Sequence, residues 1–396
     1  MPRLLVLAST YPRWIGDREP GFVHELSRRL VDRFRVTVIC PHAQGAARRE
    51  VMDGVEVVRF RYAPERFERL VNDGGIVSNL RKRPWTRLLV PLFVLSQAFA
   101  LAVEARRRGV DVVHAHWLVP QGFLVALLQA MRVVRAPFVV TSHGGDLFAL
   151  RGKLMGAVKR YVIHRAAAVT VVSEGMREAL NDIGVAPDLA RVEPMGVDLV
   201  GRFSPDPGIE RSRNQLLFVG RIVEKKGLMH LIEALPKVRA VRPDIELVVA
   251  GFGPEEATCR RRVKELGLDD CVRFEGAVEQ AALPGYYRRA ALFVAPFVEA
   301  ATGDQDGLGL VTIEALGCGC PVVVSDMPAT RGLIGLGGPI YPATSGDEES
   351  LAIAILSALS NPPGPRIDLS WFDWGTRAKA YSAVLTLAMG CERDRA

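Results

Sequence analysis

The stretch GDQDGLGLVTIEALGCGCPVV places two carboxylates, Asp306 and Glu314, on either side of a glycine-rich helix start. Gly307 and Gly309 would let a ligand approach the backbone, and a helix beginning near Leu310 would offer free N–H groups and a positive dipole end. Such a helix start suits a phosphate group, and carboxylates suit hydroxyl groups because charge-assisted hydrogen bonds are strong. In the structural alternative, Asp306 caps the helix and Glu314 faces solvent.

A second stretch, LLFVGRIVEKKGLMHLIEAL, contributes two cations. A strand ends at Gly220, Arg221 follows at its carboxyl end, and Lys226 precedes a helix that opens at Gly227. A guanidinium can hold two phosphate oxygens, and an ammonium adds a compact charge. Alone, the pair could simply face water. Together with the helix start, it predicts a site in which a diphosphate is neutralised from both sides.

These stretches carry a family resemblance. The set VGRIVEKKG, GFGPEE, FEGAV, LFVAPF and DGLGLVTIEALGCGCPVVVSD resembles the donor domain of glycosyltransferase family 4 (glycosyl transferases group 1), which are retaining enzymes of the GT-B fold. The resemblance implies that Arg221 and Lys226 bind the diphosphate of a nucleotide-sugar and take part in catalysis. It implies that Glu314 binds the ribose. Asp306 stands where the family has a glutamate, and the resemblance assigns it to the donor sugar and to catalysis.

The same resemblance assigns the backbone of Gly307, Leu308, Gly309 and Leu310 to the donor site. It implies no cofactor and no metal, since the nucleotide-sugar is a co-substrate. The letters DQD before the glycines spell a metal-binding D-x-D of another transferase fold, but the predicted cations already offset the diphosphate charge. GFG lacks the third glycine and the acidic partner of a dinucleotide fingerprint.

Three stretches of the first half resemble the family as well: STYPRWIGDREPGFVHELSRRL, DVVHAHWLVPQG and FVVTSHGGDLF. His143 resembles the active-site histidine of the family, which contacts the donor sugar, and is predicted to be catalytic. Gly21, Phe22, His116 and Asp146 are predicted to bind the acceptor. The alternatives are a plain strand-to-helix turn at Gly21 and a core hydrogen-bonding role for His116.

Short apolar runs alternate with helical patterns along the chain, which is typical of parallel βαβ units. We therefore predict an α/β protein of the GT-B class, with two Rossmann-like, doubly wound parallel-sheet domains facing across a cleft. The predicted parts are an acceptor-binding domain over 1–200, a donor-binding domain over 201–370, and a C-terminal helix over 371–396 that packs back toward the first domain. Expected strands lie at 3–8, 35–40, 55–60, 111–114, 137–141, 168–172, 216–220, 245–251, 271–276, 292–297 and 321–326.

Charge is unevenly distributed over the 396 residues. The formal net charge is +7, but residues 1–200 hold 29 Lys/Arg against 19 Asp/Glu, whereas the remainder holds 22 against 25. The basic first half predicts an anionic surface as its partner. The apolar segment 88–103 is too short to span a bilayer. We expect it to form a buried helix, and its basic flanks leave a membrane-lying helix as the alternative.

The predicted function is transfer of a hexosyl group, with retention and without metal, from a nucleotide-diphospho-sugar to an acceptor hydroxyl. The acceptor would be a glycan or a lipid-linked sugar in cell-surface polysaccharide or glycolipid assembly. The predicted location is the cytoplasm, and peripheral attachment to the inner face of the membrane is the alternative. Two alternatives are a nucleotide-sugar epimerase of the same fold and a basic nucleic-acid-binding protein, although the sequence shows no nucleic-acid motif.

Overall fold

The computed structural model describes residues 1–17, 21–71, 76, 79–80, 83–361, 364 and 366–390. The chain forms two compact units. Unit 1 comprises Met1–Val172, Arg177–Gly196 and Trp374–Ala396, and unit 2 comprises Ser173–Met176 and Val197–Asp373. The domain boundaries predicted from the sequence lie between residues 200 and 201 and between residues 370 and 371.

The two ends of the main segment of unit 2 lie side by side. The N–H of Val197 donates to the carbonyl of Phe372 at 2.8 Å, and Val197 and Asp373 form an isolated parallel bridge. Unit 2 is thus an insertion in the chain of unit 1, which resumes at Trp374.

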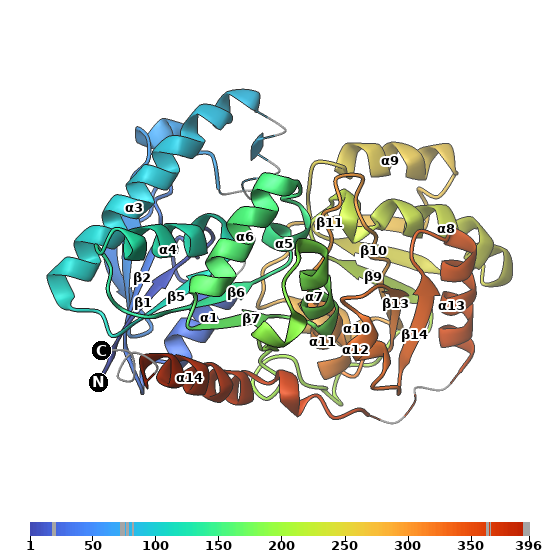
Figure 1. Cartoon of the computed structure of the whole chain (residues 1–396). Coiled ribbons are helices and arrows are strands. Elements are labelled where there is room, and N and C mark those ends of the chain that lie inside the picture. The colour runs from blue at the N-terminus through green and yellow to red at the C-terminus, as the bar shows by residue number, and fades with distance from the viewer. Residues whose placement is uncertain are drawn as a thin grey trace. The chain divides into compact units, whose positions relative to one another are not determined.

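Unit 1 is built on an eight-stranded sheet of order β3-β4-β2-β1-β5-β6-β7-β8 (Figure 1). All neighbouring pairs are parallel except β3 with β4. The central strands are buried along their length, as expected for strands covered on both faces. The strands are β1 (Arg3–Leu7), β2 (Arg35–Pro41), β3 (Arg49–Met52), β4 (Val55–Phe60), β5 (Val112–His116), β6 (Phe138–Ser142), β7 (Ala168–Val171) and β8 (Ala190–Val192).

Helices cover this sheet. Helix α4 contacts both α3 and α6, while α1 contacts α14, which also lies against β5 and β6. Buried residues fix α14: Arg377 donates to the Glu193 carboxylate at 2.7 Å, and the Tyr381 hydroxyl donates to the Glu193 carbonyl at 2.6 Å. The helices are α1 (Phe22–Arg29), α3 (Leu89–Arg108), α4 (Phe123–Ala130), α5 (Gly145–Phe148), α6 (Lys153–Arg165) and α14 (Trp374–Gly390), and α7 (Glu174–Glu178) runs from the segment of unit 2 into that of unit 1.

Unit 2 is built on a six-stranded, fully parallel sheet of order β11-β10-β9-β12-β13-β14. The order reverses between β9 and β12, and ligands bind at the carboxyl ends of the strands at such a switch point. The strands are β9 (Gln215–Val219), β10 (Glu246–Ala250), β11 (Val272–Gly276), β12 (Leu292–Ala295), β13 (Val322–Asp326) and β14 (Ile340–Thr344), and the helices are α8 (Leu228–Val241), α9 (Glu256–Glu265), α10 (Leu283–Arg289), α11 (Leu310–Gly317), α12 (Arg331–Ile334) and α13 (Glu348–Ser360).

The α/β class and the predicted strands are confirmed, but three strands were not predicted: β3, β8 and β14. β3 and β4 form a hairpin through the two-residue turn Asp53–Gly54, in which both residues have positive φ. β14 contains Pro342 and lies at the edge of its sheet, where a residue without an N–H is tolerated.

The loop that follows β9 is held tightly against the chain that leaves β12. Gly227 has a φ of +70°, and a Cβ built on it would lie 1.7 Å from the carbonyl oxygen of Pro296. Only glycine fits this contact, because a side chain would meet rigid backbone rather than a flexible side chain. The contact fixes the position of the preceding residue, Lys226.

We therefore expect Gly227→Ala to destabilise the protein more than Gly267→Ala. Gly267 is the matched control because its φ is +65° but no atom lies within 4 Å of the place that a Cβ would take. The control should lose about 1–2 kcal/mol from the left-handed backbone alone, and Gly227→Ala about 1–3 kcal/mol more from overpacking. Urea unfolding followed by circular dichroism would measure the difference. Equal losses would show that the loop is not clamped at this point.

Candidate functional site

In unit 2, the predicted donor-site residues gather at the carboxyl edge of the sheet. Arg221 and Lys226 lie on the loop after β9, whereas Asp306 lies on the loop after β12 and Glu314 in the helix that follows that loop. Because β9 and β12 are neighbouring parallel strands, their outgoing loops emerge at the same place.

Lys226 and Asp306 are in direct contact. The Lys226 ammonium donates to the Asp306 carboxylate at 2.5 Å, and it also lies 4.7 Å from the centre of the Phe297 ring. Burial favours the neutral acid, but the charges of Lys226, Lys225 and Arg221 together hold the pKa of Asp306 below its usual value. Lys226 is predicted to bind the diphosphate and Asp306 the sugar, and the structure shows that the two side chains also pair with each other.

Lys225 is a member of this cluster that the sequence reasoning missed. Its ammonium lies 3.1 Å from the Asp304 carboxylate and 3.8 Å from that of Asp306. Both carboxylates of the D-x-D are therefore paired with lysines. The doubled lysine in EKKG was the available signal, but sequence spacing alone could not show that both side chains reach the same loop.

The start of α11 lies beside this charge cluster. Gly309 is its N-cap residue with a φ of +72°, and a Cβ there would come within 2.6 Å of the Phe297 ring. The first N–H groups of a helix have no acceptor within the helix, so this end can receive an anion. Gly307 and Leu308 are buried, and Leu310, the first residue of the helix, is half-buried.

Glu314 lies one turn into α11 and is half-buried. The hydroxyl of Tyr287, itself fully buried, donates to its carboxylate at 2.9 Å. Burial raises the pKa of Glu314 to about 7, although the Tyr287 hydrogen bond and the charges of Arg202 and Lys226 oppose the shift. Glu314 therefore does not face open solvent, and no side chain caps the start of α11, so neither part of the structural alternative holds.

In unit 1, two predicted histidines meet at the ends of neighbouring strands. His116 ends β5 and His143 follows β6; their Nδ1 and Nε2 atoms lie 2.9 Å apart, and their rings stack at 5.2 Å. Burial lowers the pKa of His143 to about 3 and the pKa of His116 well below its usual value. Both rings are therefore neutral near pH 7, so His143 is suited to hydrogen bonding rather than to proton donation.

Aromatic rings surround His143. The Phe22 ring lies 4.8 Å from it and the Trp117 ring 5.0 Å. Phe22 begins α1 directly after its N-cap residue, Gly21, and Trp117 has a φ of +79°, which is rare for a residue with a side chain. Strained residues of this kind cluster at functional sites. The sequence reasoning predicted Phe22 and Gly21 here but gave Trp117 no role.

Asp146 is only 4% exposed. Its two carboxylate oxygens accept hydrogen bonds from the Leu118 N–H at 2.6 Å, the Ser142 hydroxyl at 2.9 Å and the His143 N–H at 3.2 Å. These contacts connect the loop after β5 with the loop after β6. We infer that Asp146 positions His143, and its contact with the acceptor stays a prediction.

The structure thus brings the predicted residues together in two groups, one in each unit. The first consists of Arg221, Lys226, Asp306, Gly307, Leu308, Gly309, Leu310 and Glu314, and the second of Gly21, Phe22, His116, His143 and Asp146. Within the residues that the structure describes, no group of three His, Cys, Asp or Glu side chains is arranged to hold a metal ion.

Solved structures of similar fold are GT-B glycosyltransferases. The sucrose-phosphate synthase of Thermosynechococcus elongatus matches with a TM-score of 0.72 and 19% identity, over 99% of this chain and 98% of that one. The HepE protein of Anabaena, solved in complex with UDP-glucose, matches with a TM-score of 0.67 and 17% identity, over 100% and 99% of the two chains. The fold is therefore GT-B.

Two sequence families match consecutive parts of the chain: Glycosyltransferase Family 4 over residues 22–200 and Glycosyl transferases group 1 over residues 202–369. The chain therefore belongs to glycosyltransferase family 4 (glycosyl transferases group 1), as its motifs predicted.

Curated relatives include mannosyltransferases. A GDP-mannose-dependent α-(1-6)-phosphatidylinositol monomannoside mannosyltransferase of Mycolicibacterium smegmatis is 30% identical over 283 residues, which cover 65% of this chain and 72% of that protein. A phosphatidyl-myo-inositol mannosyltransferase of Mycobacterium leprae is 29% identical over 356 residues, which cover 83% and 88%.

The Lys226–Asp306 pair gives a prediction that separates the roles of its two members. Because the carboxylate competes with a diphosphate for the ammonium, Asp306→Asn should tighten the binding of a nucleoside diphosphate by roughly three- to tenfold, as expected for loss of about 1 kcal/mol of pairing. Sugar transfer should nevertheless fall, because the asparagine amide accepts hydrogen bonds from the hydroxyls of the donor sugar more weakly than the carboxylate does. Calorimetry with UDP and GDP would measure binding.

Asp304→Asn is the matched control, because it removes the nearer of the two carboxylates beside Lys225 and leaves the Lys226–Asp306 pair intact. It should change diphosphate affinity less than Asp306→Asn does. Weaker diphosphate binding by Asp306→Asn would mean that the carboxylate supports the cation site rather than competing for it.

Proposed function

We propose that this glycosyltransferase moves a hexosyl group, with retention of configuration and without a metal ion, from a nucleotide-diphospho-sugar to an acceptor hydroxyl. The observation that carries the proposal is the edge of unit 2, where Lys226 and Arg221 lie with the start of α11 and a half-buried carboxylate, Glu314. A diphosphate there meets positive charge from two loops, and its ribose diol has an acceptor one helical turn away.

The same arrangement supports a mechanism in which the leaving group is stabilised electrostatically. As the glycosidic bond breaks, charge grows on the diphosphate. Arg221, the helix start and Lys226, once its ammonium exchanges Asp306 for a phosphate oxygen, stabilise that charge. We propose that the departing diphosphate takes the proton of the acceptor hydroxyl on the same face of the sugar. The donor-sugar contact of His143 stays a prediction from the family resemblance.

The acceptor class and the location are proposed from the relatives and from charge. Both relatives are named as mannosyltransferases that act on phosphatidylinositol-based lipids. We propose a lipid-linked or glycan acceptor used in glycolipid or cell-surface polysaccharide assembly, at the cytoplasmic side of a membrane. The basic first half of the chain fits an anionic acceptor surface.

Glu314 gives the proposed donor site a pH dependence. Its pKa of about 7 means that the carboxyl is mostly protonated at pH 6 and mostly ionised at pH 8. The ionised form accepts the ribose hydrogen bonds better, so nucleoside diphosphate affinity should rise roughly tenfold over this range. Calorimetry at both pH values would test it. Glu314→Gln should bind the nucleoside diphosphate weakly at both pH values and lose the part of the pH dependence that Glu314 causes. Any pH dependence that remains in this variant comes from titration of the phosphate itself.

The proposed activity is tested by a donor screen followed by an acceptor assay. Thermal-shift measurements with UDP-, GDP-, ADP- and dTDP-sugars should show stabilisation by donors of one base, since a ligand that binds only the native state raises its stability. GDP-mannose is the first candidate because one relative uses it. Release of the nucleoside diphosphate should then depend on an added lipid-linked or glycan acceptor, without added metal.

Arg221→Ala should lower kcat far more than donor affinity, because its charge acts mainly on the leaving group. Release of nucleoside diphosphate at an unchanged rate without any acceptor would favour the epimerase alternative. Absence of stabilisation by all four donor classes would contradict the proposed donor.

A further inference from the structure

Helix α3 of unit 1 is apolar on two opposite faces. Its inner face carries Leu89, Phe93, Gln97, Leu101 and Glu104, all of which are at most 7% exposed. This face packs on β2 and β4 of the sheet and on α4. The buried helix expected from the sequence is therefore confirmed for this face only.

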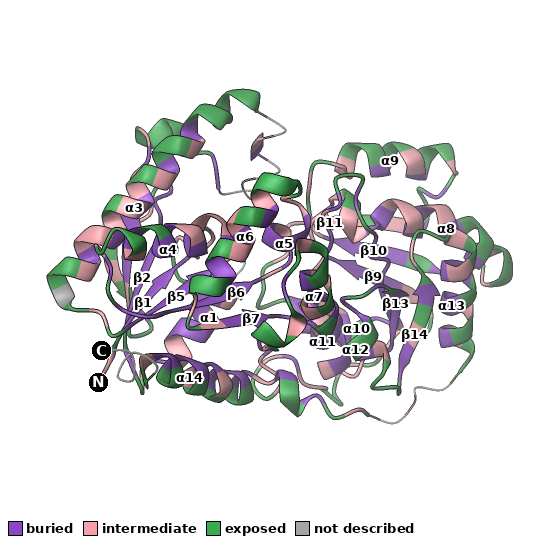
Figure 2. Cartoon of the chain, in the orientation of Figure 1, coloured by how far each residue is buried: buried purple, intermediate pink, exposed green. Residues whose placement is uncertain are grey.

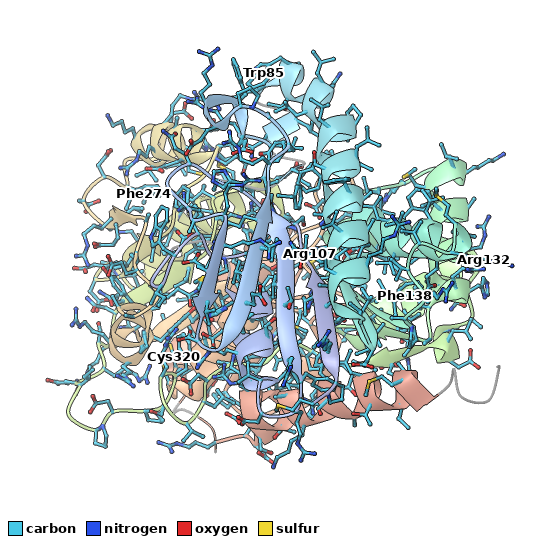
Figure 3. The ribbon with its side chains drawn as sticks, turned by 90° about the vertical axis from the view of Figure 1, so that its left-hand side faces the viewer. Trp85, Arg107, Arg132, Phe138, Phe274 and Cys320 are labelled. Atoms are coloured by element: carbon cyan, nitrogen blue, oxygen red, sulfur yellow. The ribbon has the colours of Figure 1, made fainter. Side chains whose placement is uncertain are left out.

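The outer face is equally apolar but lies open. Leu88 is 75% exposed, Leu92 49%, Leu95 66% and Phe99 72%, and these positions recur every three or four residues along one side of the helix. Figure 2 shows exposed residues along the outer side of α3. Trp85, 43% exposed, lies at the start of the helix, as Figure 3 shows. A helix that is apolar all round is normally buried in protein or in lipid.

By length and composition alone, the segment Pro84–Arg107 could cross a membrane, and 28% of its most apolar window is buried in the protein. The inner face shows why it lies on the sheet instead. The Gln97 side chain donates to the carbonyl of Ala8 and accepts from Gln121, and Glu104 pairs with Arg49 of β3. These polar contacts hold the helix to the sheet of unit 1, so that only the outer face is available to a lipid surface.

Positive charge borders the apolar outer face at both ends. Arg83 and Arg87 are exposed before the helix, and Arg106 and Arg107 are exposed at its end. Trp85 and Arg107 mark these two ends in Figure 3. Cations that flank an apolar stripe, with an aromatic residue at one end, are typical of a helix that lies in the interface of an anionic membrane.

The neighbouring helices continue this charge pattern. Residues 81–165 contain 14 Lys/Arg against 3 Asp/Glu, although Arg81 and Lys82 lie outside the described residues. Helices α4 and α6, which complete the layer, contain no acidic residue. Glu104 and Asp146 are buried, and the third acid, Asp111, precedes β5 and accepts a hydrogen bond from the Arg3 N–H. The described surface of this helical layer therefore presents apolar and cationic side chains without an exposed carboxylate on its helices.

We propose that the outer face of α3, with Trp85 and the arginines at its two ends, docks unit 1 on a membrane that contains anionic lipids. A second copy of the chain is a poorer occupant, because a symmetric contact would bring these arginine clusters against each other. A nucleic acid would meet leucines where stacking aromatics are expected. The inference concerns a surface of unit 1, whereas the proposed donor site lies in unit 2, and it does not depend on the proposed function.

Co-sedimentation with vesicles tests the docking. The full chain should sediment with phosphatidylcholine vesicles containing one third phosphatidylglycerol, less so at high salt, and weakly with phosphatidylcholine alone. Leu95→Glu/Phe99→Glu should reduce the binding at least tenfold. The matched control is Val241→Glu/Ile353→Glu, which changes the net charge equally at two exposed apolar residues of unit 2 and should bind as the wild type does. Thermal melts would establish that both variants fold.

A fluorescent label distinguishes insertion from simple charge attraction. The described cysteines are buried, so a polarity-sensitive dye on Leu95→Cys, in a Cys391→Ser background, reports on the outer face of α3. Its emission should shift to the blue when anionic vesicles are added, whereas the dye on Ile353→Cys should not respond. Equal binding by Leu95→Glu/Phe99→Glu and wild type, or no blue shift, would overturn the proposal. So would sedimentation velocity showing a dimer that Leu95→Glu/Phe99→Glu dissociates.

Discussion

The site in unit 2 depends on a single backbone contact, in which Gly227 lies directly against the carbonyl of Pro296. The contact joins the loop that leaves β9 to the chain that leaves β12, at the point where the strand order of the sheet reverses. It places Lys226 beside Asp306 and over Phe297, and Phe297 in turn packs on the glycine that begins α11. Two cations, an acid and a helix start are thereby held close together by parts of the chain about 80 residues apart.

The two units use the same sheet edge for different chemistry. Unit 2 assembles charges there. Because Lys225 and Lys226 pair with carboxylates, an anionic ligand has to compete with those carboxylates for the two ammonium groups. Unit 1 assembles neutral histidines and aromatic rings at the ends of β5 and β6, where burial prevents protonation of His116 and His143. Such a surface favours stacking and neutral hydrogen bonds, which are the interactions that a sugar ring with many hydroxyls can use.

Sequence reasoning recovered the alternating strands and helices, and it missed the contacts that depend on the direction in which a side chain points. Buried aliphatic runs predicted the parallel strands, and the glycine-rich helix start with Arg221 and Lys226 predicted the group of residues in unit 2. The hairpin of β3 and β4 was missed although Asp53–Gly54 is a strong turn signal, and β14 was missed because Pro342 argues against a strand anywhere except at an edge. That Lys225 reaches Asp304, that Asp146 faces backbone N–H groups, and that one side of α3 stays uncovered could not be read from residue type and spacing, because each depends on where a side chain points.

The position of α14 has a consequence for the order of events during synthesis. This helix is the last described element of the chain, yet its buried residues Arg377 and Tyr381 complete the packing around Glu193 in unit 1. As a ribosome releases the chain from its N-terminus, the whole of residues 197–373 emerges before that helix does. Unit 2 can therefore fold on the nascent chain before α14 is translated, and until then the face of β5 and β6 that α14 covers stays open.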